Sequence, residues 1–209
     1  MIDLYTWSTP NGRKVSIMLE EVGLSYKAIA VNIGQREQFA PEFLAISPNN
    51  KIPAIVDRDN GVTMMESGAI LLYLAEKTGK LMPADDRSRW QVQEWLMMQM
   101  GTVGPMLGQA HHFNHFNPDK SEYARKRYVD EAKRIYGVLD RRLAGREYLV
   151  DEYSIADVAT WPWISRYEWQ GIDWVDYPHL LRWYREIAVR PAVQRGYVVP
   201  RFVNPVPMP

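Results

Sequence analysis

The N-terminal third of the chain alternates short apolar runs with segments in which apolar residues recur at helical spacing. Ile2–Thr6 and Tyr26–Val31 are rich in β-branched and aromatic residues, which predicts two strands. Between them lies a predicted helix that Gly23 ends, with an apolar face formed by Val15, Met18, Leu19 and Val22. Pro41–Leu44 opens a short helical turn. The pattern therefore reads strand, helix, strand, short helix.

A hairpin and a longer helix follow. Ala54–Val56 is a short apolar run that begins after Pro53, and 59–61 reads Asp-Asn-Gly, a combination typical of hairpin turns. We therefore expect Val62–Met65 to return as an antiparallel partner. Ser67 precedes an apolar helical run and is a good N-cap candidate for it.

The element order predicts a mixed sheet. A strand-helix-strand crossover joins parallel strands and a hairpin joins antiparallel ones, so about four strands should form one sheet with the order βαβαββα. This arrangement is thioredoxin-like and would occupy residues 1–79. Residues 80–86 read as a linker, and 87–209 contain no convincing strand, which predicts an all-α C-terminal domain.

The expected helical domain has four recognisable segments and a tail. Ser154 and Asp157 form the pattern of a capping box at the start of one helix. Pro191 is expected to stop the last helix, and the proline-rich end of the chain to be extended. The predicted helices cover 85–115, interrupted near 101–108, then 121–143, the segment after 154, and 177–189.

The amino-acid composition excludes several classes of partner and of functional site. The 25 basic and 25 acidic residues balance, so neither nucleic acid nor an anionic membrane surface is an expected partner. No apolar run approaches the length of a membrane-spanning helix, and we expect a soluble, cytoplasmic protein. The chain has no cysteine, which excludes disulfides, thiolate metal sites and a nucleophilic sulfur of its own.

The hairpin region has the features of a ligand site. The backbone at Ile52, before Pro53, has no predicted strand partner and could pair with an extended amide chain. The helix that begins near Ser67 directs amides and the positive end of its dipole at a carboxylate. Glu66 could hold an ammonium group. A peptide with an α-amino acid end would satisfy all three features, although a capped hairpin in any α/β protein would give the same local pattern.

These segments resemble the bacterial nu-class glutathione transferases, which act as disulfide-bond oxidoreductases. The resemblance runs from Met1 to about Pro191 and is carried by two stretches, Ser47-Pro48-Asn49-Asn50-Lys51-Ile52-Pro53-Ala54-Ile55-Val56-Asp57 and Glu66-Ser67-Gly68-Ala69-Ile70-Leu71-Leu72-Tyr73-Leu74-Ala75-Glu76-Lys77-Thr78-Gly79. It implies a glutathione-binding thioredoxin-like domain with a cis-proline at Pro53. It also implies a homodimer, with the first helices of the helical domain as a plausible interface.

The turn before the first helix is where the resemblance places the sulfur of glutathione. Amides at a helix N-terminus favour a thiolate, and the resemblance favours Thr9 and Asn11 as its catalytic partners ahead of Ser8. Both residues could equally be simple helix caps. Because the chain has no thiol, the ligand would supply the nucleophile.

The resemblance assigns the remaining ligand contacts. Glu66 and Ser67 would take the γ-glutamyl end, and the Ile52 backbone before Pro53 would pair with the cysteinyl residue. Gln38 and Lys51 would lie near the glycyl carboxylate, although such residues in loops are often only solvated. Arg127, directly before a tyrosine of the second long helix, would reach a second glutathione from the helical domain.

A histidine pair is the alternative metal site. His111 and His115 are four residues apart and could share a helix face, a spacing that two zinc ligands can use. No carboxylate completes the pattern of a hydrolytic zinc helix, and no cysteine is available. We therefore expect a structural or cleft-lining role and no metal.

Three functions remain open at this stage. The favoured one is glutathione-dependent disulfide reduction, with organic hydroperoxide reduction as a related activity. Conjugation of glutathione to electrophiles is the second, and a non-enzymatic binding or regulatory role is the third. Reduced glutathione or its disulfide is the expected cosubstrate, together with a small disulfide or electrophile.

Overall fold

The computed structural model describes residues 1–209 and divides into two compact units. Unit 1 comprises Met1–Met82 and Val189–Val206, and unit 2 comprises Pro83–Ala188 and Pro207–Pro209. Unit 1 holds the sheet and unit 2 is helical, so the predicted fold class is confirmed. The contact-based units differ from the division into 1–79, 80–86 and 87–209, which stays a prediction.

The sheet of unit 1 has four strands in the order β2-β1-β3-β4. β1 pairs parallel with β2 and antiparallel with β3, and β3 pairs antiparallel with β4. The mixed sheet and the hairpin expected from the Asp-Asn-Gly turn are therefore both present. The strands are β1 (Ile2–Thr6), β2 (Tyr26–Ala30), β3 (Ala54–Asp57) and β4 (Thr63–Met65).

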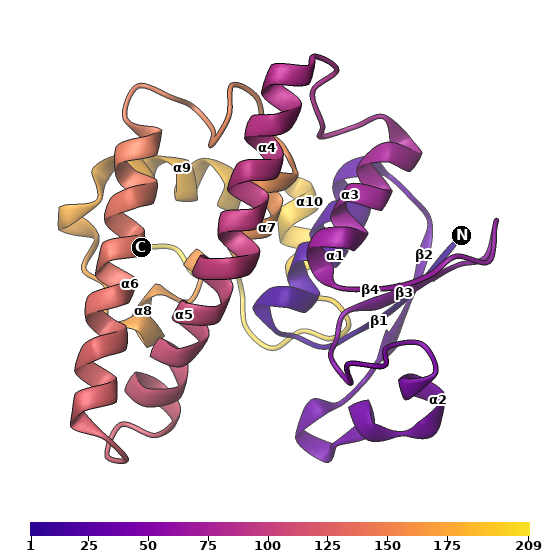
Figure 1. Cartoon of the computed structure of the whole chain (residues 1–209), viewed down its shortest axis with the longest axis horizontal. Helices are drawn as coiled ribbons and strands as arrows, with labels where there is room; N and C mark the ends of the chain where they lie inside the picture. Colours follow the sequence, from indigo (N-terminus) through magenta and orange to yellow (C-terminus); the bar gives the residue numbers. More distant parts are fainter. The chain divides into compact units, whose positions relative to one another are not determined.

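Helices α1 and α3 lie side by side against the sheet, and α10 packs on α1 (Figure 1). The core between these layers is apolar, and β1 and β3 contribute Leu4 and Ile55 to it, both fully buried. The helices of unit 1 are α1 (Pro10–Val22), the 3-10 segments η1 (Ile33–Gln35) and η2 (Glu37–Phe39), α2 (Pro41–Leu44), α3 (Ser67–Thr78) and α10 (Pro191–Tyr197).

Two local predictions were wrong. The helix predicted over 177–189 ends before Pro191 as expected but is not the last, because Pro191 occupies the first position of α10, where a proline needs no hydrogen-bond partner for its nitrogen. Ser67 is the first helical residue of α3 rather than its N-cap. The cap is Glu66, whose backbone has φ 69° and ψ 111°, a conformation outside the common regions for a residue with a side chain.

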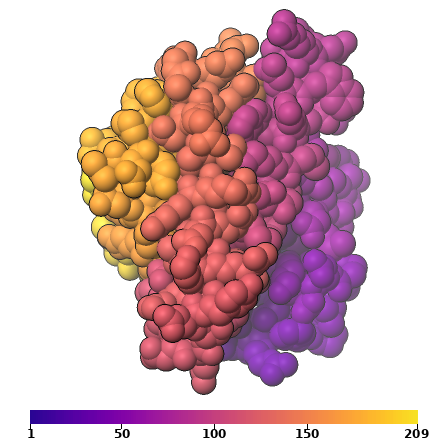
Figure 2. Space-filling view, turned by 60° about the vertical axis from the view of Figure 1, so that its left-hand side comes forward, coloured from indigo at the N-terminus to yellow at the C-terminus, as the bar shows by residue number.

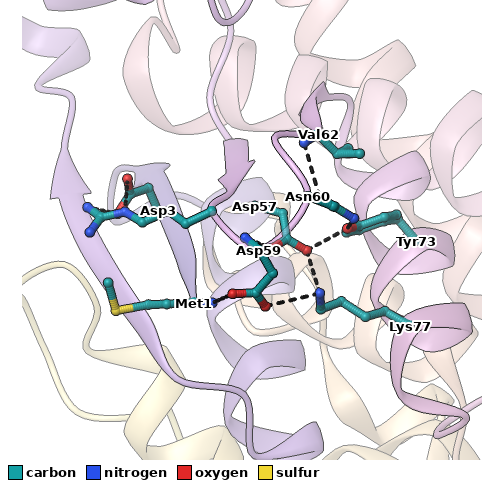
Figure 3. Close-up of polar contacts among 9 residues, drawn as sticks. Met1, Asp3, Asp57, Asp59, Asn60, Val62, Tyr73 and Lys77 are labelled. Carbon is teal, nitrogen blue, oxygen red and sulfur yellow. Dashed lines mark hydrogen bonds and ion pairs between the residues drawn. The ribbon is translucent and has the colours of Figure 1, made fainter.

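A polar network fastens the β3–β4 hairpin to α3 (Figure 3). Tyr73 Oη donates to Asp57 Oδ2 over 2.5 Å, and Lys77 Nζ lies 2.7 Å from the same carboxylate. Lys77 also lies 3.3 Å from Asp59, which the Met1 ammonium contacts at 2.6 Å. Burial alone would raise the pKa of Asp57, but the hydrogen bonds from Lys77 and Tyr73 outweigh it and lower the pKa to about 2.

Unit 2 is built from helices, of which α6 forms much of the surface seen in Figure 2. Two π-helical segments interrupt the first long predicted helix; η3 overlaps the break predicted near 101–108, and η4 follows after it. The elements are α4 (Asp86–Met98), η3 (Gln99–Val103), α5 (Gly104–Ala110), η4 (His111–Phe116), α6 (Glu122–Leu143), α7 (Ile155–Ile164), α8 (Tyr167–Gln170), the 3-10 segment η5 (Trp174–Asp176) and α9 (Pro178–Ala188).

The predicted capping box at the start of α7 is confirmed. Ser154 caps the helix, and the buried Asp157 carboxylate accepts from Ser154 N at 3.0 Å. The same carboxylate accepts from Leu149 N at 3.0 Å and Trp183 Nε1 at 2.8 Å. It therefore ties α7 to the preceding loop and to α9. No helix of the chain combines the length and apolar character needed to cross a bilayer.

Candidate functional site

The sheet register brings three loop segments to one end of unit 1. Tyr5 pairs with Ala54, and Ala54 pairs with Met65. The turn after β1, the residues before β3 and the residues after β4 therefore leave the sheet at the same end. Because α1 follows β1 and α3 follows β4, the N-termini of both helices also begin there. Two positive dipole ends and one unpaired strand end are brought together.

The turn before α1 separates the roles of two hydroxyl groups. Thr9 is the N-cap, and its Oγ1 accepts from Gly12 N at 3.2 Å. The structure gives the Thr9 hydroxyl proton no acceptor, so it can be donated to a ligand. Ser8 instead donates its hydroxyl proton to Arg201 O at 3.3 Å. This geometry favours Thr9 over Ser8 for a sulfur contact. Asn11 lies half-buried in the first turn of α1.

The shape of this turn depends on a glycine and on the end of the chain. A Cβ on Gly12 would lie 2.2 Å from Trp7 O and 2.5 Å from Thr6 Oγ1, so only glycine fits. On the outer side of the turn, the Arg201 guanidinium lies 4.5 Å from the centre of the Trp7 ring. The segment after α10 therefore braces the turn, a contact that no local sequence signal indicated.

The segment before β3 presents an unpaired backbone. The Ile52–Pro53 bond is cis, as the resemblance implied. Neither the N–H nor the C=O of Ile52 pairs with another backbone group. The preceding carbonyl, that of Lys51, accepts from Ser47 Oγ at 2.9 Å, which holds the strand end in place. The Ile52 side chain packs against the small core cluster around Phe43. The backbone is thus available to an added strand.

Glu66 and Ser67 form the third segment. Glu66 is exposed, and its Oε1 accepts from Asn49 Nδ2 at 3.4 Å. Ser67 is buried, 3% exposed, and its Oγ accepts from Lys14 Nζ at 3.3 Å. Lys14 was not among the site residues predicted from the sequence. Its side chain is only 1% exposed, and burial lowers its pKa to about 7 although Glu66 acts to raise it.

A signal for Lys14 was present in the sequence. Ile17 and Met18 lie three and four residues after it on α1, and both are fully buried. A lysine on the apolar face of a predicted helix is unusual, because burying an ammonium group is costly. This position therefore marks Lys14 as a candidate functional residue.

Gln38 lies in η2, and Lys51 directly precedes Ile52. Gln38 is partly buried, and its Oε1 has no hydrogen-bond partner in the structure. Buried amide groups are usually paired, so this group has capacity for a ligand. Lys51 is exposed.

Arg127 belongs to unit 2, where it lies exposed on α6. It lines a concave region of about 560 Å³ that carries both cationic and anionic side chains. The lining residues are Met106, Tyr123, Lys126, Arg127, Tyr128, Asp130, Glu131 and Arg134. A carboxylate ligand could bind to the cations of this region.

The histidine pair has other partners. His111 Nε2 lies 2.9 Å from Gln170 Nε2, and the His111 ring stacks on Trp163 at 5.4 Å. Burial lowers the pKa of His111 to about 3, so the ring is neutral and accepts this hydrogen bond. His115 stacks on Trp169 at 4.3 Å. No group of three or more potential metal ligands occurs in the structure.

Comparisons with known proteins find similarity over most of the chain. Residues 4–81 match the glutathione S-transferase N-terminal domain, and residues 97–191 match its C-terminal domain. Disulfide-bond oxidoreductase YfcG of Escherichia coli is 52% identical over 92% of both chains. A Pseudomonas putida glutathione transferase with one glutathione disulfide bound per subunit is 45% identical, with a TM-score of 0.91 over 95% of this chain and 91% of the other. A Burkholderia graminis glutathione transferase with two glutathione molecules bound per subunit is also 45% identical, with a TM-score of 0.90 over 95% and 88%.

Proposed function

We infer that this chain, which belongs to the glutathione S-transferase family, is a glutathione-dependent disulfide-bond oxidoreductase. The observation that carries this proposal is the Thr9 hydroxyl at the N-terminus of α1, which has a proton to donate in a protein without cysteine. The relatives support it, since one is named as a disulfide-bond oxidoreductase and another binds glutathione disulfide.

The three loop segments suit three parts of glutathione. Glu66 and Ser67 bind the ammonium and carboxylate of the γ-glutamyl end. The unpaired backbone of Ile52 before Pro53 pairs with the cysteinyl residue as a short added strand. Gln38 and Lys51, of which Lys51 is exposed, bind the glycyl end. A tripeptide held at both ends has its sulfur fixed in the middle, at the turn before α1.

The sulfur contacts activate glutathione as a nucleophile. A thiol has an unperturbed pKa of about 8.5, so most of it is protonated at neutral pH. Hydrogen bonds from Thr9 and Asn11, together with the dipole of α1, stabilise the thiolate over the thiol. The protein thus lowers the pKa of the ligand's sulfur and contributes no atom that forms a covalent bond.

The reaction consumes two glutathiones. The thiolate of the first attacks one sulfur of the substrate disulfide, the S–S bond breaks, and the departing sulfur leaves with the electron pair and takes up a proton. A second glutathione thiolate then attacks the glutathione sulfur of the mixed disulfide and releases the other substrate thiol. Glutathione is oxidised to its disulfide, and the substrate gains two electrons and two protons. We propose Arg127 as a contact for the carboxylate of the second glutathione.

The decisive measurement compares two reactions of the purified protein. We expect reduction of a small disulfide such as 2-hydroxyethyl disulfide to be faster, relative to the uncatalysed rate, than conjugation of 1-chloro-2,4-dinitrobenzene. The reason is that the turn offers Thr9 and Asn11 to a thiolate that attacks a disulfide, but it has no tyrosine, serine or cysteine in the role usual for conjugation. If conjugation is the faster reaction, the protein is a conjugating transferase.

A pair of variants tests the role of the hydroxyl. Thr9→Val removes the proton donor and keeps the shape, and it should lower kcat/KM for the disulfide by about tenfold, the value of one charge-assisted hydrogen bond. Thr9→Ser keeps a hydroxyl and should retain most of the activity. Equal rates for the two variants would remove Thr9 from the mechanism.

We also propose that the protein is a homodimer. On α4, Trp90 is 69% exposed and Met97 is 54% exposed, and the two lie seven residues apart on one helix face. Large apolar side chains exposed together on one face are typical of an interface. Light scattering after gel filtration should give twice the 24.3 kDa of the chain, and Trp90→Glu should reduce it.

The proposed activity requires a compartment that keeps glutathione reduced. The cytoplasm provides this condition, and we propose it as the location. The expected ligands are glutathione and a small disulfide, with no role for nucleic acid or membranes. Within the chain, we propose 1–79 as the glutathione-binding domain, 80–86 as the linker and 87–209 as the helical domain.

A further inference from the structure

The segment that follows α10 returns to the turn that carries Thr9. Arg201 contacts both residues directly before Thr9. Its carbonyl oxygen accepts from Ser8 Oγ at 3.3 Å, and its guanidinium lies 4.5 Å from the centre of the Trp7 ring. The reaction described above gives these contacts no role.

The hydrogen bonds within the turn fix Thr9 but not the side chains before it. Thr9 N donates to Trp7 O at 2.7 Å, and Thr9 Oγ1 accepts from Gly12 N at 3.2 Å. Neither bond involves the Trp7 ring or the Ser8 hydroxyl, and both of these side chains are half-buried. The contacts with Arg201 therefore restrain the outer side of the turn.

Arg201 is itself held in place on both sides. Before it, α10 is bonded to α1 through Arg13 Nε, which donates to Tyr197 O at 3.0 Å. After it, Asn204 Nδ2 donates to Tyr197 Oη at 3.3 Å, and the Val206 side chain is buried. Arg201 thus has a defined position relative to α1, the helix that Thr9 caps.

We propose that Arg201 is a positioning residue for the sulfur of glutathione. It acts through Trp7 and Ser8, and it keeps the turn in the geometry in which the Thr9 hydroxyl donates its proton to the sulfur. The inference rests on the proposed function and adds to it a residue from the C-terminal end of the chain.

The same contacts decide between two neighbouring hydroxyl groups. The Ser8 proton is donated to the Arg201 carbonyl, so toward a ligand Ser8 Oγ can only accept. A thiolate has no proton to donate and gains nothing from such a group. Thr9 Oγ1 accepts from Gly12 N and keeps its proton for the ligand. Thr9 is therefore the hydroxyl that stabilises the thiolate while Arg201 holds Ser8.

The size of the effect follows from the contacts. A cation on an aromatic ring at an exposed site is worth a factor of about two to five. The Thr9 hydrogen bond is worth about tenfold, and Arg201 acts through it, so the loss of Arg201 costs less than the loss of Thr9. We expect Arg201→Leu to lower the ratio of thiolate to thiol in bound glutathione by about twofold to fivefold.

Ultraviolet absorbance measures this ratio directly, because a thiolate absorbs where a thiol and a thioether do not. The signal is the difference between the complexes with glutathione and with S-methylglutathione, both at neutral pH. The kcat for disulfide reduction should fall by the same factor as the ratio. The affinity for S-methylglutathione, measured by calorimetry, should stay as in the wild type, because the proposed contacts of the two ligand ends lie on other segments.

Three further variants separate positioning from a through-space effect of the Arg201 charge. Trp7→Leu keeps the charge but removes the ring, and it should lower the ratio as Arg201→Leu does. In a Thr9→Val background, Arg201→Leu should cause no further fall, because the group through which it acts is gone. Phe202→Ala is the matched control on the same segment, since Phe202 is 68% exposed, and it should behave as the wild type.

The outcomes separate this inference from the proposed function. If the wild type binds neither glutathione nor S-methylglutathione, the proposed function fails. If the wild type binds both and Arg201→Leu leaves the thiolate ratio unchanged, only the role of Arg201 is overturned. An equal fall with and without Thr9 would also overturn it, since that result identifies a charge effect.

A higher thiolate ratio in Arg201→Leu would overturn the inference as well, because it would show that the released Ser8 hydroxyl reaches the sulfur. Arg201 is exposed, so its replacement leaves the core of unit 1 intact. If Trp7→Leu does not fold, Arg201→Leu with and without Thr9→Val still decides the question.

Discussion

The packing of α10 on α1 leads to a quantitative prediction about Gly196. A Cβ at this position would lie 2.6 Å from Ile17 Cα and 2.7 Å from Ile17 N. Carbon atoms in ordinary contact are about 3.5–4.0 Å apart, so Gly196→Ala must push α10 away from α1 by about 1 Å. Backbone atoms cannot swing aside as a side chain can, and the helices themselves must move.

The cost can be worked out from what this movement disturbs. Overpacking of this kind costs about 1–3 kcal/mol of unfolding free energy. The same movement stretches two hydrogen bonds between the helices, Ser16 Oγ to Gly196 O at 2.7 Å and Arg13 Nε to Tyr197 O at 3.0 Å, each worth about 1 kcal/mol. We expect a loss of about 3 kcal/mol, which for a chain of this size lowers the Tm by about 6–12 °C.

Thermal and urea unfolding followed by circular dichroism measure this loss. The matched control is Gly137→Ala in α6, where a new Cβ meets only the flexible Nη1 end of Arg141 at 3.3 Å. Alanine is the better helix former by about 1 kcal/mol, so the control should not lose stability. The reasoning is refuted if Gly196→Ala melts within about 2 °C of the wild type, or if both variants lose the same stability.

Three further predictions concern binding and stability. Glu66→Gln should weaken glutathione binding about tenfold in calorimetry, because it removes the charge that pairs with the ligand ammonium. Asp157→Ala should lower the unfolding free energy by at least about 3 kcal/mol, since it strands several buried donors, whereas Ser154→Ala should cost about 1 kcal/mol. The lowered Asp57 pKa stabilises the fold above about pH 4, and this contribution is lost as the pH falls toward about 2; Asp57→Asn should flatten the fall of Tm over that range.

Each of these has a clear contrary result. Unchanged affinity in Glu66→Gln would assign the ammonium to another group. Equal stabilities for the Ser154 and Asp157 variants would mean that the carboxylate acts only as part of the cap. An acid-melting curve for Asp57→Asn that parallels the wild type would show that the hairpin network does not govern stability at low pH.

Local chemistry explains what could be predicted from the sequence. The Asp-Asn-Gly turn and the crossover of the first helix determine which strands run parallel, so the mixed sheet followed from short segments. The capping box at Ser154 is also local, because its partner lies three residues away. The candidate site at Pro53 and Glu66 could be proposed because the two strand ends are joined by one tight hairpin.

The features that could not be predicted from the sequence depend on contacts between residues far apart in the chain. The resemblance put Thr9 ahead of Ser8, but the physical distinction depends on Arg201, 193 residues away from Ser8. α10, which begins at Pro191, packs on α1 because Gly196 has no side chain and lets the two helix backbones come into contact. No local sequence pattern indicates this fit.

The sequence alone determined the order of elements, the hairpin and the absence of a protein thiol, which depend on turn chemistry, periodicity and composition acting over a few residues. The residues proposed to hold glutathione came from the resemblance to a known family. Only the tertiary structure decided that Thr9 rather than Ser8 has a hydroxyl proton to donate and that Glu66 rather than Ser67 caps α3. It also decided that Lys14 is buried in contact with Ser67. Burial and hydrogen-bond direction depend on atoms brought together from distant parts of the chain, and only the folded protein places them.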